Sequence, residues 1–334
     1  MANEDFAQKL HAVVARHIGS PGTIHELRQL TGGANKTTWS FEAEIGLKRE
    51  RFILQLASNR PDDQPNPLAD EVPRVTADED ARLMIEAVKV GVPAPHVRAI
   101  LEPPDAMGPG YVTEWVDGET LATRILREER FAAARRKMAT QCGEILANIH
   151  KIRLEAVPFL KPQDPAKVLR NQRIIVDFHG LRLPALEYGL KWAQEHLPTR
   201  AKTTVVHGDF RHGNFIVGEE GIRCVLDWEV GQAGDPMQDL GWVCVKTWRF
   251  GGRRPVGGFG TREDLFAAYE KASGQSVDPE HVKWWEAFGS VKWAVGCLGL
   301  GTRGVEEVNV ERSAIGRRIE EPLWDFFSLI EGRD

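Results

Sequence analysis

The stretch from 203 to 242, TTVVHGDFRHGNFIVGEEGIRCVLDWEVGQAGDPMQDLGW, decides the fold because it holds the chain's densest set of side chains that can act as acids, bases or metal ligands. Its β-branched start predicts a short strand that ends at the tripeptide His207-Gly208-Asp209. Asn214 and Asp227 follow downstream at spacings that a random sequence rarely provides. The stretch therefore predicts a polar site at the end of a strand.

Two apolar runs flank the turn sequence GEEG at 218–221, and this pattern predicts a β-hairpin. An unbroken register from that turn places Asn214 opposite Val225. Asp227 then lies two positions, or roughly 7 Å, farther along the ladder. Oxygen-bearing side chains at that separation can share Mg²⁺, a hard ion that takes oxygen ligands.

An aspartate beside such a metal pair suits phosphoryl transfer. One acid accepts the proton of the substrate hydroxyl, and the amide and second acid hold the metal on the phosphates. A purely structural alternative remains for single residues, since HGD tripeptides are common in turns. His207 is expected to fix the loop by hydrogen bonding, while Asp235 and Asp239 are expected to cap a helix and brace a loop.

The motifs HGDFRHGN, LDWE and GDPMQDL resemble the signature of the aminoglycoside phosphotransferase/choline-kinase-like family. These small-molecule kinases share the protein-kinase fold. The resemblance implies an α+β fold of two lobes, with a β-rich N-terminal lobe and a mainly helical C-terminal lobe. It also implies that Asp209 is the catalytic base and that Asn214 and Asp227 are Mg²⁺ ligands.

A Gly-rich segment at 31–38 lies between an expected strand at 24–30 and another at 39–43, after an expected helix at 4–18. Alone it is typical of an ordinary hairpin loop. With the downstream motifs, it predicts a loop whose N–H groups face phosphate oxygens. The residues assigned to the nucleotide here are Gly32, Gly33, Asn35, Lys36 and Thr37.

The strand expected at 51–57 departs from the family pattern, because Gln55 stands where the family places Lys or Arg. Glutamine carries no charge for the α- and β-phosphates. Three other cations are available to compensate, namely Arg49, Arg51 and Lys36. On the helix expected at 77–90, with Thr76 or Asp78 as its start, the family acid falls at Glu79 or Asp80. That acid then lacks its usual partner on the strand.

The segment 111–118 resembles the hinge between the lobes, whose backbone binds adenine. By this analogy the Glu114 carbonyl and the Val116 amide contact the base. The lobes are accordingly expected at 1–116, for the nucleotide, and 117–334, for catalysis and the acceptor.

The C-terminal part is expected to be helical at 131–151 and 183–197 and Pro-interrupted at 152–170. Six of the ten tryptophans lie from Trp242 onward, where they either form the core or line an acceptor pocket. The Arg-rich loop at 249–260 either is solvated or meets an anionic acceptor such as a phosphate or coenzyme A group. An acidic run at 306–311 is an alternative rim for cationic acceptors.

The composition of the 334-residue chain limits its partners. A net charge of −5 and a pI near 6.1 give no indication of a nucleic-acid or anionic-membrane partner. The four cysteines lie in apolar contexts and are expected to be reduced core thiols, which favours the cytoplasm. No apolar run has the length of a membrane-spanning helix.

The resulting hypothesis is transfer of the γ-phosphoryl group of ATP or GTP to a hydroxyl of a small molecule. The acceptor stays open among aminoglycosides, choline, homoserine and sugars. TGGANKTTWSF and GVPAP resemble kinase-like domains fused to acyl-CoA dehydrogenases, which hints at a hydroxyacyl acceptor. Because of Gln55, a non-catalytic nucleotide- or metabolite-binding pseudokinase is the alternative. A metallohydrolase is a third option and would need a set of metal ligands rich in histidine.

Overall fold

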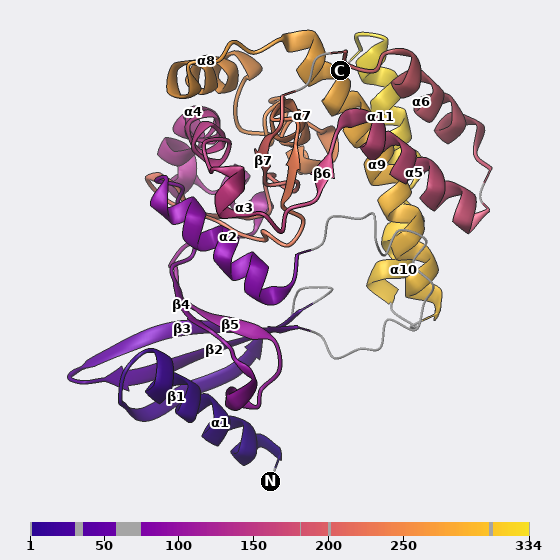
Figure 1. The fold of residues 1–334 in the computed structure, drawn as a ribbon. Helices are drawn as coiled ribbons and strands as arrows, with labels where there is room; N and C mark the ends of the chain where they lie inside the picture. Colours follow the sequence, from indigo (N-terminus) through magenta and orange to yellow (C-terminus); the bar gives the residue numbers. More distant parts are fainter. Residues whose placement is uncertain are drawn as a thin grey trace.

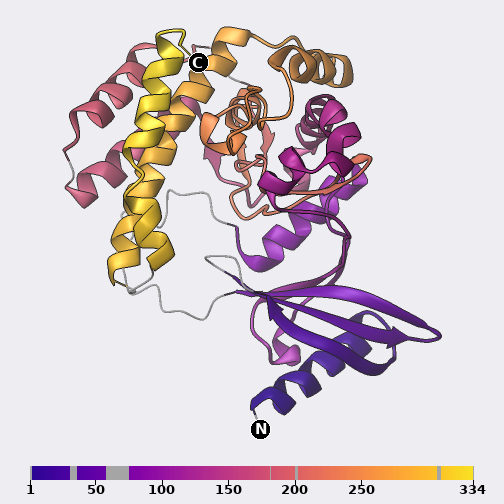
Figure 2. The same ribbon diagram turned by 180° about the vertical axis from the view of Figure 1, so that it is seen from behind.

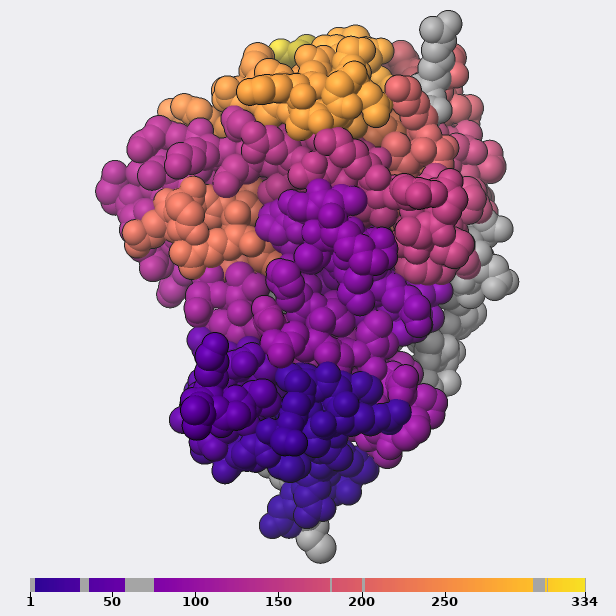
Figure 3. All heavy atoms as spheres, turned by 60° about the vertical axis from the view of Figure 1, so that its left-hand side comes forward, coloured from indigo at the N-terminus to yellow at the C-terminus, as the bar shows by residue number. Residues whose placement is uncertain are grey.

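The computed structural model describes residues 2–30, 36–57, 75–180, 182–199, 202–306 and 310–333. A β-sheet lies at one end of the molecule and a large group of helices at the other (Figure 1). The space-filling view shows the same division, with indigo and violet atoms at one end and magenta to orange atoms at the other (Figure 3). The predicted two-lobed, protein-kinase-like α+β architecture is confirmed.

The N-terminal sheet has five strands in the order β1-β2-β3-β5-β4, all paired antiparallel. Their bounds are Pro21–Leu30, Lys36–Ile45, Lys48–Ala57, Val97–Ile100 for β4 and Gly110–Glu114 for β5. Helix α1, Ala2–His17, packs on this sheet through Leu10, Val13 and Val14, which bury against Phe41 and Phe52. The predicted helix and the three strands that follow it are confirmed.

Helix α2, Ala77–Lys89, lies between the sheet and the helical part (Figure 1). Thr76 caps it, and a capping box forms because the Glu79 side chain accepts from the Thr76 N–H. The apolar face of α2, with Leu83 and Met84, belongs to the large helical core rather than to the core beneath the sheet. The expected helix is confirmed, and Thr76 is its start signal.

The helical part is built around the long helix α9, which is coloured orange to yellow (Figure 2). Its Trp284 and Trp285 are buried in the core. Its helices are α3 (Ala122–Arg127), α4 (Ala132–Ile149), α5 (Pro165–His179), α6 (Pro184–Glu195), α7 (Met237–Trp242), α8 (Arg262–Ser273), α9 (Pro279–Glu306), α10 (Val310–Gly316) and α11 (Glu320–Ile330). None of the helices in the described ranges is both long and apolar enough to cross a membrane.

Helix α5 was not among the expected elements, because the prolines near it were taken to interrupt the chain. Asp164 caps this helix by accepting from the Lys167 N–H at 2.7 Å, and Pro165 occupies its first turn. A proline in that position needs no N–H partner, so it starts the helix instead of breaking it.

Two small sheets carry the central motifs. One has the order β6-β10-β7, with bounds Pro162–Gln163, Gln232–Gly234 and Thr204–Val206. The other is the expected hairpin, formed by β8, Phe215–Gly218, and β9, Gly221–Val225. The predicted turn is confirmed, since Gly218 pairs with Gly221.

The predicted register of this hairpin is wrong by one residue. Phe215, not Asn214, lies opposite Val225, because β9 holds an extra residue, Arg223, in a bulge. The Leu226 N–H donates to the Asn214 carbonyl at 2.8 Å. Asp227 therefore lies one position beyond the residue that faces Asn214, which brings the two closer along the chain direction than an unbroken ladder does.

Candidate functional site

A loop of eight residues, 207–214, follows β7 and carries most of the predicted site. The buried carboxylate of Asp239, on α7, accepts from the N–H groups of His207 and Gly208 at 2.8 and 2.9 Å. His150 also contacts Asp239, at 3.3 Å, and Tyr269, at 2.9 Å. Asp239 thus fixes the start of the loop, as the sequence analysis expected for a bracing carboxylate.

The His207 ring ties this loop to the strand that leads into Asp227. Its Nδ1 accepts from the Asp209 N–H at 3.2 Å, so its Nε2 carries the proton that it donates to the Leu226 carbonyl at 3.2 Å. Burial lowers the pKa of His207, against the opposing effects of Asp239 and Asp209. A neutral ring matches both hydrogen bonds, and the expected loop-fixing role of His207 is confirmed.

Asp209 lies among donors. Arg211 Nε donates to both of its carboxylate oxygens, at 3.0 and 3.1 Å, and Trp242 Nε1 donates to Oδ1 at 2.7 Å. Asn214 Nδ2 donates to Asp209 Oδ2 at 2.7 Å and to the Asp209 carbonyl at 3.0 Å. The side chain of Asp209 remains 20% exposed, which leaves room for a hydroxyl to approach.

Asp227 adopts a left-handed backbone with a φ of 66°, an uncommon conformation for a residue with a side chain. Desolvation by the surrounding protein, with the negative charges of Glu229 and Asp209, raises its pKa to about 7. Asp227 nonetheless remains accessible to solvent, so this desolvation is incomplete. Strained backbone and crowded acids in one place are typical of functional sites.

The donor set fits a hard divalent cation. Asn214 and Asp227 supply amide and carboxylate oxygens, which Mg²⁺ takes together with waters and phosphate oxygens. Within the described ranges no set of three or more His, Cys, Asp or Glu side chains is arranged to hold a metal. Asn214 and Asp227 would be two protein ligands for such an ion.

An ion pair joins the sheet to α2, although Gln55 removes the usual cation. Lys36 Nζ, on β2, lies 2.5 Å from Asp80 Oδ2 and 3.3 Å from Glu229 Oε2. Burial alone lowers the pKa of Lys36, but Asp80, Glu229 and Asp227 outweigh it and raise that pKa. The usual partner on β3 is absent, as expected from Gln55, and Lys36, one of the three cations named to compensate, pairs with Asp80 from the neighbouring strand.

Gln55 belongs to the same network. It lies opposite Thr38 in the β2–β3 ladder. The Tyr111 hydroxyl lies within hydrogen-bonding distance of Gln55 Oε1 and 2.7 Å from Asp80 Oδ2. Gln55 is thus a polar neighbour of the ion pair.

The other described residues that the sequence analysis assigned to the nucleotide lie on β2, at the end of β5 and just after it. Thr37 is in β2 opposite Leu56, and Glu114 ends β5, while Val116 follows that strand. The Trp115 N–H donates to the Arg51 carbonyl at 3.0 Å, which holds the segment between these two residues against β3. Gly32, Gly33 and Asn35 lie outside the described residues.

An aromatic cluster adjoins Asp209 through Trp242. Trp242 and Trp248 have ring centroids 5.3 Å apart, and Trp248 and Trp293 have centroids 4.9 Å apart. This group is separate from the main core, which holds Trp284 and Trp285. The expected core role is confirmed for Trp284 and Trp285, whereas a role in an acceptor pocket stays a prediction.

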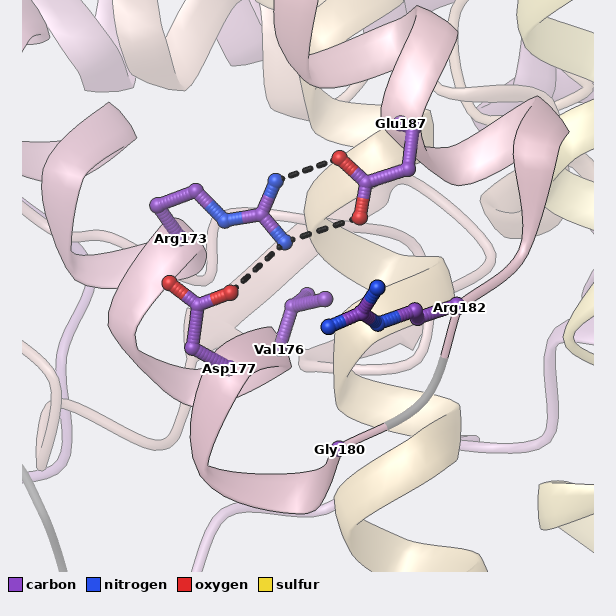
Figure 4. A pocket seen from close by; sticks show the side chains of 6 residues that line it. All are labelled: Arg173, Val176, Asp177, Gly180, Arg182 and Glu187. Atoms are coloured by element: carbon purple, nitrogen blue, oxygen red, sulfur yellow. Dashed lines mark hydrogen bonds and ion pairs between the residues drawn. The ribbon is translucent and has the colours of Figure 1, made fainter.

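Two pockets lie outside this constellation. One, of about 460 Å³, lies between α5 and α6, where Arg173 is paired with Glu187 and Asp177 across the opening (Figure 4). The other, of about 440 Å³, is bordered by Phe250 and Phe259 of the loop at 249–260. Its lining is rich in arginine, namely Arg127, Arg135, Arg136, Arg253 and Arg254. Neither pocket contains Asp209, Asn214 or Asp227.

The model of the phosphotransferase enzyme family matches residues 26–285, which include Lys36, Asp209, Asn214 and Asp227. The chain belongs to this family. Mouse acyl-CoA dehydrogenase family member 10 is 29% identical over 209 residues, covering 60% of this chain and 20% of that protein. Family member 11 from Gallus gallus is 36% identical over 64 residues, covering 18% of this chain and 8% of that protein. The chain thus spans a fifth or less of these curated relatives.

Solved structures of phosphotransferases show the same fold. A candidate aminoglycoside phosphotransferase from Ralstonia eutropha superposes with a TM-score of 0.75 at 19% identity, covering 97% of this chain and 98% of that one. Spectinomycin phosphotransferase, in complex with ADP and spectinomycin, gives 0.62 at 13% identity, covering 96% and 98%. Choline kinase from Streptococcus pneumoniae gives 0.57 at 12% identity, covering 96% and 99%.

Proposed function

We propose that this chain is a small-molecule kinase that transfers the γ-phosphoryl group of ATP or GTP to a hydroxyl of its acceptor. The observation that carries this proposal is the joint fixing of three residues. Asn214 donates directly to Asp209, and the backbone of Leu226, which precedes Asp227, is bonded to both Asn214 and His207. The Asp209 carboxylate and the two proposed metal ligands, Asn214 and Asp227, are thereby held together.

In this mechanism Asp209 orients the acceptor hydroxyl and accepts its proton as the oxygen attacks phosphorus. Asn214 and Asp227 would hold Mg²⁺, which neutralises negative charge on the phosphates. Lys36 provides a further cation for the phosphates from β2. Trp242 and Asn214 keep the Asp209 carboxylate in place, so that positioning contributes much of the rate.

We also propose the division of labour between the two lobes. Residues 1–116 form the nucleotide lobe, with the segment from Gly32 to Thr37 over the phosphates and the backbone of Glu114 and Val116 on the base. Residues 117–334 form the catalytic lobe, which binds the acceptor. ADP is bound by the spectinomycin phosphotransferase with the same fold, which supports a nucleotide donor.

The alternative is a pseudokinase that binds a nucleotide or metabolite without turnover. It rests on Gln55, which carries no charge at the position on β3 where the family places Lys or Arg. The contact between Lys36 and Asp80 favours the active enzyme, because it keeps a lysine and an acid paired at the nucleotide edge. A degenerate site has no need of this buried pair.

Calorimetric titration of ATP and GTP, with and without Mg²⁺, tests the proposal on the wild-type protein, Asp209→Asn and Asp227→Ala. We expect Mg²⁺-dependent binding to the wild type and to Asp209→Asn, and its loss in Asp227→Ala. ADP formation with a hydroxyl acceptor should occur in the wild type alone. Turnover by Asp209→Asn at the wild-type rate, or absence of any nucleotide binding, would contradict the proposal.

A further inference from the structure

The acceptor side of the site is lined by indole rings. Trp242, at the end of α7, donates through Nε1 to Asp209 Oδ1 at 2.7 Å. Trp248 lies in a short 3₁₀ helix, Lys246–Arg249, and Trp293 lies on α9. Under the proposed function Lys36 and Gln55 serve the nucleotide, so the indoles beside Asp209 are left for the acceptor.

A lysine covers the first of these rings. Lys292 Nζ, on α9, lies 4.8 Å from the centroid of the Trp242 ring. No hydrogen bond or ion pair joins its ammonium group to any other described residue. Burial lowers the pKa of Lys292, although Asp209 and Asp239 oppose this effect. A poorly hydrated ammonium without an acidic contact gains more from an anionic ligand than an exposed one does.

A second cation covers the next ring. The Arg211 guanidinium carbon lies 4.5 Å from the centroid of the Trp248 ring, while its Nε donates to Asp209. Its bonds to Asp209 use only Nε. The two terminal NH₂ groups of a guanidinium have the fork geometry that suits carboxylates and phosphates.

The third feature is an unused donor. Trp248 is only 5% exposed, and its Nε1 has no hydrogen-bond partner in the described part of the chain. Buried N–H groups are seldom left unpaired, so an orphan at this position indicates a group that is supplied by a ligand. The unpaired donor belongs to Trp248, and the two cations lie over the rings of Trp242 and Trp248.

The acids nearest this wall are already engaged. Asp209 is covered by Arg211, Trp242 and Asn214. The charge of Asp239 is directed to the backbone of the loop and to His150. A cationic acceptor would meet the like charges of Lys292 and Arg211, whereas an anion would meet these two cations and the Trp248 N–H.

We propose that the acceptor is an anion, a hydroxy compound with a carboxylate or phosphate group that pairs with Lys292, Arg211 and Trp248. Its carbon skeleton lies on the indoles, and its hydroxyl reaches Asp209. This inference rests on the proposed kinase function. The acceptor oxygen forms a bond to the γ-phosphorus, the bond from that phosphorus to the bridging oxygen breaks, and ADP leaves. The hydroxyl proton passes to Asp209.

A matched panel of acceptors tests this inference. The probes are straight-chain ω-hydroxy compounds of three to six carbons that end in carboxylate, phosphate, alcohol or ammonium. ADP formation is measured for each with the wild-type protein, Lys292→Met, Lys292→Glu and the control Lys283→Met on the same helix. Tryptophan fluorescence in the presence of Mg²⁺ and ADP measures acceptor binding independently of turnover.

We expect the wild type to favour the anionic members over the ammonium members by at least about tenfold in kcat/KM. Lys292→Met should raise KM for the anions about tenfold or more, whereas its Kd for ATP and the behaviour of Lys283→Met stay at wild-type values. Lys292→Glu should favour ammonium. The ratio of carboxylate to phosphate turnover identifies which anion is preferred.

Three results would overturn the inference. These are preference of the wild type for ammonium or neutral acceptors, unchanged anion kinetics in Lys292→Met, and no fluorescence response to any anion at millimolar concentration. Failure of the kinase function itself looks different, because the wild type then binds no nucleotide and forms no ADP with any member of the panel.

Discussion

Lys36 Nζ lies 2.5 Å from Asp80 Oδ2, and this contact joins strand β2 of the N-terminal sheet to helix α2. Asp80 is 1% exposed, and its second oxygen, Oδ1, has no hydrogen-bond partner in the described part of the chain. The Tyr111 hydroxyl lies between this acid and Gln55. Lys36 on β2 therefore supplies Asp80 with the positive charge that Gln55 on β3 does not carry.

Lys36→Met is expected to lower kcat/KM for ATP by about 100-fold, since it removes a positioned cation from the phosphates. Steady-state kinetics with varied ATP measure this effect. Lys48→Met, at the exposed far end of the β2–β3 hairpin, is the matched control and should retain wild-type kinetics. Thermal unfolding of each variant shows whether loss of the Asp80 partner also destabilises the lobe.

Returning the cation to β3 tests the same idea in the opposite direction. Gln55→Lys in the Lys36→Met background places an ammonium beside the Tyr111 hydroxyl and within the same network. We expect it to recover at least about tenfold of the lost kcat/KM. Unchanged kinetics in the single variant, or no recovery in the double variant, would argue that Lys36 only stabilises the fold.

Asp239→Ala is expected to destabilise the protein by about 3 kcal/mol, because two backbone N–H groups and His150 lose a buried charged acceptor. Asp177→Ala is the control, since its ion pair with Arg173 is 67% exposed at the aspartate and should contribute less than about 1 kcal/mol. Urea denaturation of both variants provides the comparison. Similar free energies for the two variants would contradict the bracing role of Asp239.

Gly208 has a φ of +81°, and a Cβ there would lie 2.5 Å from the Val230 carbonyl oxygen. Gly208→Ala should therefore add a steric clash to the cost of a left-handed backbone. Gly274, with a φ of +70° and nothing within 4 Å of a Cβ, isolates the backbone cost of about 1 kcal/mol. Urea denaturation should show a clearly larger loss for Gly208→Ala than for Gly274→Ala, and equal losses would refute the clash.

The central motifs could be predicted from the sequence because the contacts that fix them are local or follow strand periodicity. Asp209 and Asn214 are five residues apart on one loop, and GEEG sets the hairpin turn. The bulge at Arg223 could not be predicted, since β-branched and apolar residues on either side allow both registers. Pro165 was misjudged because a proline that starts a helix looks like one that ends it.

The ion pair between Lys36 and Asp80 was missed for another reason. The residues are 44 positions apart, and their contact depends on how α2 packs against two strands. Lys36 was only one of three candidate cations, and side-chain reach across a sheet edge is not encoded in periodicity. The stacking of Arg211 on Trp248 likewise joins segments that are distant in the sequence. Composition alone therefore did not predict a cation over an indole ring beside Asp209.

His212 makes a pH-dependent contribution to stability. It is fully buried next to Phe215, Phe250 and Phe259, and it contacts the Gly257 carbonyl through Nδ1 at 2.7 Å. Burial lowers its pKa from 6.5 to about 4, against that hydrogen bond and with help from Arg211. Below pH 6.5 the unfolded chain therefore binds a proton at His212, whereas the native protein binds this proton only near pH 4.

Because the unfolded state binds more protons, stability should fall as the pH drops from 6.5 towards 4. Replacing His212 by Asn keeps a donor for Gly257 but removes the titration. The free energy of unfolding should then fall about 2 kcal/mol less than in the wild type between pH 7.5 and pH 5. Urea titrations of both proteins at several pH values measure the difference. Parallel curves would mean that His212 is protonated in the native state or exposed to water.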